Sequence, residues 1–245
     1  MGFQPQIGVT LMNSFKCLAI AMLLFAHTAT AQMRVGLSGG LVFSEADQSG
    51  LYNSKASSTR KFFWGGILDC SVTTGLSVVF EPSYVEKGTF ARPIDIQGYV
   101  PKLSFEQSYF EFPVLLKYSF GSSFRPHIVI GSTVGVNLSS KWRAEVRGPR
   151  IGRLEIETDA ADLVRDFEYS LEFGGGASYE IDEYISLIVE ARYAYGISNI
   201  VRKGSFTSSF GDEFFAPELE SDALYRNKGF RIKFGFSFPL QFNEQ

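Results

Sequence analysis

The chain has 245 residues, including 24 Gly, 24 Phe and 11 Tyr, with only two Trp and two Cys. This abundance of aromatic residues and glycine favours an all-β domain over a helical bundle. The formal net charge is -3 with both signs interspersed, which excludes the basic footprint of a nucleic-acid-binding protein.

The N-terminal segment has the features of a signal peptide. Lys16 precedes an apolar run over residues 17–26, and Ala29-Thr30-Ala31 is an A-x-A cleavage site. The run is too short for a spanning helix, although a retained membrane anchor is the alternative. We therefore predict a signal peptide over residues 1–31 and one exported domain over residues 32–245, since barrels often exceed the usual domain size.

Beyond the signal peptide, eight stretches alternate apolar residues with polar or small ones, which is the two-residue period of a β-strand. In chain order the predicted strands lie at about 34–44, 61–72 and 76–85, in a hairpin within 108–135, and at about 166–181, 185–198 and 229–242. The hairpin alternates over runs longer than the usual strand of a soluble domain. One face of its first run is apolar and aromatic, with Phe110, Phe112, Val114, Leu116, Tyr118 and Phe120.

The connections between these strands alternate in length. Short turns are expected near Thr73, Ser122 and Asp182. Long connections are expected over residues 45–60, 86–103, 139–165 and 199–228. Short turns on one rim, long loops on the other and an even number of strands are typical of an outer-membrane barrel. We therefore predict an eight-stranded antiparallel up-and-down transmembrane β-barrel with short periplasmic turns, long extracellular loops and both termini in the periplasm.

A soluble eight-stranded barrel with its apolar face inside, such as a lipocalin, would show the same alternation. The non-apolar face is rich in small residues such as Gly131 and Gly135, which suits the crowded interior of a narrow barrel. Aromatic residues also mark both strand ends, as in the two interfacial girdles of a membrane barrel. They are Phe43, Trp64, Tyr84, Trp142, Phe167 and Tyr195 near the loops, and Phe120, Phe124, Tyr179, Tyr184 and Phe238 near the turns.

The segment Phe110-Glu111-Phe112-Pro113-Val114-Leu115-Leu116-Lys117-Tyr118, followed by Arg125-Pro126-His127, resembles the strand–turn–strand signature of PorT-like outer-membrane β-barrel proteins of Bacteroidota. Residues 35–41 are similar to the first strand of that family. The resemblance covers essentially the whole mature chain and implies the barrel rather than a reaction. PorT itself is linked with a protein-secretion system, so the resemblance implies an envelope or secretion protein as one possible kind of partner.

Charged residues are predicted on the interior face of several strands. They are Glu81, Glu111, Lys117, Glu172, Glu190, Arg192, Arg231 and Lys233. Charges inside a narrow barrel must be paired or hydrated, and the seventh and eighth predicted strands supply both signs. We favour a structural plug of salt bridges, because eight strands leave room mainly for side chains. The alternative is a path for ions or small solutes.

The predicted mature chain has one histidine, His127, which is expected at the periplasmic end of the fifth strand. Together with Ser132 it could serve a lipid-modifying enzyme, which needs a histidine beside a nucleophile. Such barrels usually act near the outer leaflet, however, so we interpret His127 as a polar interfacial residue after Pro126. We predict no catalytic residue, no cofactor and, with Cys70 as the one mature cysteine, no metal site.

Two of the long loops carry candidate contact residues. The third holds four arginines interleaved with acidic residues, which could contact lipopolysaccharide phosphates or belong to extended strands projecting into solvent. These are Arg143, Arg147, Arg150 and Arg153. The fourth holds four phenylalanines that could form a partner surface or a short helix packed over the barrel mouth. These are Phe206, Phe210, Phe214 and Phe215.

The sequence thus predicts a non-enzymatic outer-membrane barrel with a structural or interaction role, such as an accessory of secretion or surface assembly. A narrow channel is the first alternative and a lipid-modifying barrel enzyme the second. The expected partners are outer-membrane lipid and lipopolysaccharide, an envelope or secretion protein, and the barrel assembly machinery. In better-known proteobacterial barrels a terminal aromatic residue serves that recognition, whereas here Phe242 is followed by Asn243-Glu244-Gln245.

Overall fold

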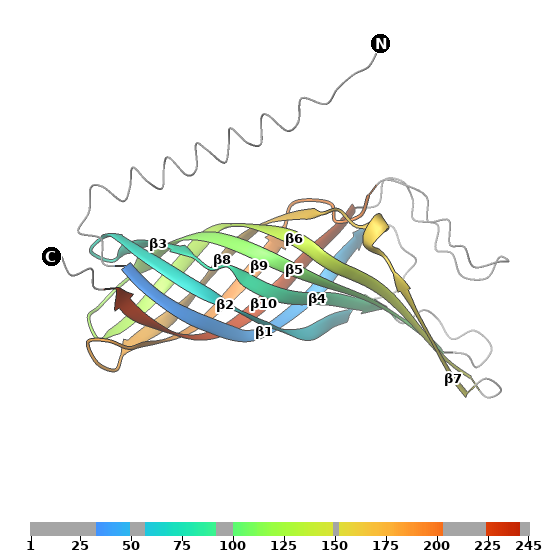
Figure 1. Cartoon of the computed structure of the whole chain (residues 1–245), viewed down its shortest axis with the longest axis horizontal. Coiled ribbons are helices and arrows are strands. Elements are labelled where there is room, and N and C mark those ends of the chain that lie inside the picture. The colour runs from blue at the N-terminus through green and yellow to red at the C-terminus, as the bar shows by residue number, and fades with distance from the viewer. Residues whose placement is uncertain (1–32, 50–56, 92–99, 149–151, 203–223, 241–245) are drawn as a thin grey trace, which may run out of the picture.

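A computed structural model describes residues 33–49, 57–91, 100–148, 152–202 and 224–240 (Figure 1). Its strands are β1 (Met33–Ser49), β2 (Ser57–Thr73), β3 (Leu76–Phe80), β4 (Ser83–Ala91), β5 (Val100–Ser119), β6 (Phe124–Gly148), β7 (Gly152–Asp159), β8 (Phe167–Glu180), β9 (Ser186–Gly196) and β10 (Leu224–Leu240). A short 3-10 helix, η1 (Ala161–Leu163), follows β7. In the part of the chain described, no helix is long and apolar enough to cross a membrane.

The sheet closes on itself, because β1 pairs antiparallel with β2 on one side and with β10 on the other. β3 and β4 are two halves of one strand: β2 opposes both in a single register, with Leu68 facing Phe80 and Gly65 facing Ser83. Pro82, which has no backbone N–H to donate, lies at the interruption. Counting these halves once and leaving out β7, the described residues form the predicted eight-stranded antiparallel barrel.

The two faces of the barrel are distributed as predicted. In β8, Phe173 is 54% exposed whereas its neighbour Glu172 is 1% exposed. The same holds in the hairpin, where Leu116 and Ile130 are exposed and Glu111 is buried. Apolar side chains therefore cover the outside, and the charged side chains of these strands lie inside together with two small apolar clusters. An apolar exterior is the reverse of a soluble barrel.

The short turns lie at one rim, together with the start of β1 and the end of β10 (Figure 1). Gly75 and Gly121 in two of these turns have φ of 88° and 87°, a backbone conformation that favours glycine. In the third turn the Asp182 side chain accepts hydrogen bonds from the backbone N–H groups of Tyr184 and Ile185. All three predicted short turns are confirmed.

The long connections contain more strand than predicted. Residues 139–165 are not a loop: β6 continues to Gly148 and turns back into β7. At about 3.3 Å per residue, β6 is roughly 80 Å long, whereas a membrane crossing takes about 9–11 residues. Residues 100–107 of β5, residues 139–148 of β6 and β7 therefore form a projection from the long-loop rim, which we call the arm (Figure 1).

Candidate functional site

A network of buried charges lies inside the barrel, beside two small clusters of buried apolar side chains. Its members are Glu81, Lys87, Glu111, His127, Glu168, Glu172, Glu190, Arg192, Arg231 and Lys233. We call this set the interior network. Seven of the eight charged residues predicted inside the barrel belong to it. The eighth, Lys117, is part-buried and pairs separately with Asp69.

Arg192 is the centre of the network and is 2% exposed. Its Nη1 lies 2.8 Å from Oε2 of Glu81 and its Nη2 donates to Oε1 of the same carboxylate at 2.9 Å. Its Nε contacts Glu190, and Nη1 lies 3.6 Å from Glu172. The planar guanidinium suits this role, since its fork of donors can meet several carboxylates at once.

Two further cations extend the network along the interior. Lys233 Nζ lies 2.6 Å from Glu81 and 3.2 Å from Glu190. Arg231 Nη2 lies 2.7 Å from Glu111 and 3.8 Å from Glu172. Arg231 faces Arg192 directly in the β9–β10 register, so Glu172, which approaches both, separates two like charges.

At the long-loop end of the network, Lys87 Nζ lies 2.8 Å from Glu111 and 3.0 Å from Glu168. The same Glu168 accepts a hydrogen bond from Asn227 Nδ2 at 3.1 Å. Lys87 was predicted to lie in a loop, because the apolar pattern of its strand ends near residue 85. The inward-facing positions Ser83, Val85, Lys87 and Thr89 are all buried, and their regular spacing was the signal that could have placed Lys87 inside.

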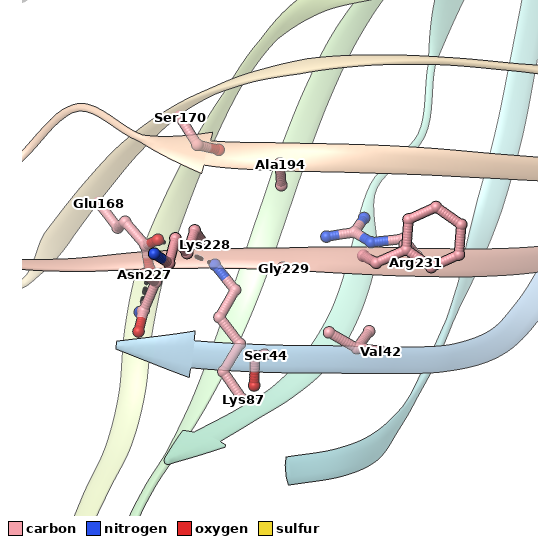
Figure 2. A pocket seen from close by; sticks show the side chains of 11 residues that line it. Val42, Ser44, Lys87, Glu168, Ser170, Ala194, Asn227, Lys228, Gly229 and Arg231 are labelled. Carbon is pink, nitrogen blue, oxygen red and sulfur yellow. Dashed lines mark hydrogen bonds and ion pairs between the residues drawn. The ribbon is translucent and has the colours of Figure 1, made fainter. Parts of the chain in front are cut away.

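A cavity of about 20 Å³ lies at this end of the network (Figure 2). Figure 2 shows Lys87, Glu168 and Asn227 converging on one side of it and Arg231 on the other. The volume holds about one water molecule, far less than a small-molecule site requires. The cavity therefore offers room for hydration of the charges and none for a substrate.

His127 does not lie at the membrane interface, so its interpretation as an interfacial residue is wrong. Its side chain is 1% exposed, and Nε2 lies 2.9 Å from Oε2 of Glu190 inside the barrel. The inward alternation of β6 continues down to the turn, which places His127 in the interior. Ser132 is exposed on the opposite face of the same strand, so the two residues cannot form a nucleophile–base pair.

A β-bulge separates the arm from the membrane-spanning part of β6. Ser108 faces Ser139 and Tyr109 faces Asn137, which leaves Leu138 without a register partner on β5. The extra residue turns the next side chains to the other face. The charged residues of β6 beyond the bulge therefore lie on the side continuous with the lipid-facing surface, which we call the outer face of the arm.

The inner face of the arm carries a small apolar core. Phe105, Ala160, Val164 and Ile200 are buried there, and Trp142 packs on Phe105 with ring centroids 5.0 Å apart. The prediction that Trp142 belongs to an aromatic girdle is therefore wrong. Other girdle residues are exposed on the barrel surface, including Trp64 and Phe167 near the loops and Phe124 and Tyr179 near the turns.

On the outer face, Arg143 donates to Glu157 at 2.9 Å, its Nε lies 3.2 Å from Glu155, and Lys141 donates to Glu157 at 2.6 Å. Hydrogen bonds from Lys141 and Arg143 lower the pKa of the Glu157 carboxyl. The hydrogen bond between Lys141 and Glu157 also raises the pKa of Lys141. The Arg143 guanidinium thus contacts carboxylates of this chain, and binding a lipopolysaccharide phosphate would require it to leave them.

The other predicted loop residues are only partly placed. Arg147 and Arg153 face each other in the β6–β7 register. Arg150 and the four phenylalanines Phe206, Phe210, Phe214 and Phe215 lie outside the described residues.

Solved structures with a similar arrangement include several outer-membrane proteins. Neisserial surface protein A is 14% identical, with a TM-score of 0.43, over 86% of this chain and all of that one. The outer membrane protein OprG from Pseudomonas aeruginosa is 12% identical, with a TM-score of 0.47, over 86% of this chain and 98% of that one. Ail, the attachment invasion locus protein of Yersinia pestis, is 12% identical, with a TM-score of 0.40, over 84% of this chain and 99% of that one.

No curated protein matches the sequence significantly. A family model does match: residues 25–202 fit the outer membrane protein beta-barrel domain, which is more than half of the chain. The closed antiparallel ring, the apolar exterior and the polar interior are the features of such a domain. The chain therefore belongs to the family of outer-membrane β-barrel proteins.

Proposed function

We propose that this protein is a non-enzymatic barrel that is closed to solutes and presents the arm as an interaction surface beyond the membrane. The observation that carries the proposal is the length of β6. This strand continues far beyond the lipid-facing surface of the barrel and pairs in the arm with β5 and β7. A barrel needs no such extension to span the membrane.

The interior network supports a closed barrel rather than a narrow channel. Arg192 on β9 meets Glu81, which lies four strands away around the ring in either direction, so this ion pair crosses the lumen. The neighbouring charges are likewise paired and buried, and the cavity beside Lys87 and Glu168 has a volume of about 20 Å³. A channel would need these pairs to separate.

The proposed orientation places both termini and the short turns in the periplasm and the arm outside the cell. The predicted signal peptide and the short-turn rim that holds both barrel ends support this orientation. The barrel assembly machinery would insert the chain, and the outer face of the arm would lie just above the lipopolysaccharide headgroups.

The resemblance to PorT-like proteins of Bacteroidota suggests an envelope or secretion protein as the partner of the arm. An enzymatic role has less support: His127 is held by Glu190 inside the barrel, and Ser132 lies on the other face of the strand. The proposed role is therefore an accessory of secretion or surface assembly.

Photocrosslinking in cells tests this role. A photoreactive residue replacing Lys141, which is exposed on the outer face of the arm, should yield discrete protein adducts. The matched control replaces Ile130, which is 62% exposed on the lipid-facing surface and should give lipid adducts or none. The same adducts from both positions, or none from the arm, would contradict an interaction role for the arm.

A further inference from the structure

We propose that the free edge of β7 receives an extended, cationic segment of a partner protein as an added β-strand. The inference rests on the proposed function and names the partner chemistry of the arm. It starts from the sheet order: within the described residues, β7 pairs with β6 on one side and stands at the end of the sheet on the other.

An open edge of this kind can pair with another chain. Alternate residues of an edge strand direct their N–H and C=O groups away from the sheet, where an added strand can bond to them. β7 is eight residues long and contains no proline, which is one of the devices that block such pairing. Addition of a strand to an exposed edge is an established mode of peptide recognition.

Hydrogen bonds and apolar packing also fix the C-terminal end of β7 in position. At the end of β7 the Ala160 backbone N–H donates to the Ser140 carbonyl at 2.8 Å, and the Ala161 N–H donates to the Asp159 carboxylate at 2.9 Å. The apolar core under the arm, including Phe105 and Trp142, packs against the same corner. A preordered edge reduces the entropy that a partner strand must overcome.

The charge of the edge strand selects the partner. Glu155, Glu157 and Asp159 follow one another at every second position of β7 and are exposed on the outer face. Lys141 and Arg143 approach Glu157 from the β6 side. A strand on the other side would bring its own side chains about 5 Å from the same carboxylates, so basic residues at alternate positions fit there.

The same charges disfavour a second copy of this chain as the occupant. Two β7 strands pairing antiparallel about Ile156 would place Glu155 of each copy opposite Glu157 of the other. Like charges directly opposite one another destabilise a strand pair. In this register the edge therefore favours a heterologous segment over a second copy.

A synthetic probe tests the proposal on the full mature protein in nanodiscs of uncharged lipid. The probe is a nine-residue peptide alternating lysine and threonine, compared with a glutamate–threonine peptide and with a lysine–proline peptide that cannot form a strand ladder. Fluorescence anisotropy measures binding, and NMR-detected amide exchange of β7 reports strand pairing.

The proposal expects the lysine–threonine peptide alone to bind and to slow exchange at alternate β7 amides. A Glu155→Gln/Glu157→Gln variant should weaken binding about fivefold, as expected for two exposed ion pairs. The matched Glu106→Gln/Glu145→Gln variant removes two outer-face carboxylates from β5 and β6 and should change binding less than twofold.

Binding without slower β7 exchange, equal binding of the lysine–proline peptide, or no binding of the lysine–threonine peptide would each overturn strand addition. These outcomes differ from failure of the proposed function. If the arm crosslinks to a protein in cells while the peptide result is negative, the arm still interacts but not through its edge. If crosslinking from the arm also fails, both proposals fall.

Discussion

Arg192 and Glu81 lie 111 residues apart in the chain and join opposite walls of the barrel. Two nitrogen–oxygen contacts of 2.8 and 2.9 Å connect the guanidinium to the carboxylate across the lumen. Because both groups are buried, neither can exchange its partner for bulk water. In the closed barrel that we propose, this pair is a contact that crosses the lumen.

Removing the central cation should destabilise the barrel. Arg192→Gln leaves Glu81 and Glu190 with fewer compensating charges, and breaking a buried ion pair costs about 3–5 kcal/mol. Urea unfolding of the protein in lipid bilayers measures the loss. The control is Arg202→Gln, because Arg202 is 47% exposed in its pair with Asp166 and should cost about 1 kcal/mol or less. Equal losses in both variants would contradict a central role for Arg192.

His127 should contribute to stability from inside the barrel. His127→Phe removes one of the groups that contact Glu190 and should cost about 1–3 kcal/mol, whereas His127→Gln keeps a donor and should cost less. The same unfolding assay separates the variants. Two variants as stable as the parent protein would contradict a stabilising role for the contact between His127 and Glu190.

Acid should loosen the outer face of the arm. The folded-state pKa of Glu157 is lowered, so its bonds to Lys141 and Arg143 are complete above the ordinary value of 4.5 and are lost as pH falls through the lower folded-state pKa. NMR shifts of the β7 amides between pH 7 and pH 3 report this change. The Glu157→Gln variant should not show it, and the same transition in that variant would assign it to another group.

Trp142 should hold the arm without supporting the barrel. Trp142→Ala removes the ring that packs on Phe105 and should cost about 2 kcal/mol locally, less than for a fully buried tryptophan. Limited proteolysis should then cut the arm faster while the barrel stays resistant. Trp64→Ala, which removes a ring that is 66% exposed on the barrel surface, should not accelerate that cut. Faster cleavage in both would contradict a local role for Trp142.

The barrel strands could be predicted because apolar residues such as Phe110, Phe112 and Val114 recur at every second position. The arm was not predicted, because beyond the bulge at Leu138 the apolar residues Trp142, Ala144 and Val146 alternate with charged ones, which is a pattern also typical of a solvated segment. Residues 139–165 were therefore interpreted as a long connection rather than as strands. For the arginine-rich part of this stretch, extended strands projecting into solvent were the favoured interpretation, and β6 and β7 agree with it.

Most members of the interior network could likewise be predicted, because the alternation of apolar and polar residues along a strand shows which side chains face inward. The pairing could not. Arg192 and Glu81 meet because ring closure and strand stagger bring distant positions to the same height, and neither quantity is readable from one sequence. For the same reason Arg231 pairs with Glu111 on β5 rather than with Glu190 on the adjacent strand.

Planar-bilayer recording of the purified protein tests most directly whether the barrel is closed and its function therefore lies at the arm. We predict no discrete openings from the parent protein, because the interior network spans the lumen. Discrete openings that are abolished by replacing Glu190 or Arg231 would contradict the account and identify the same charges as the lining of a channel.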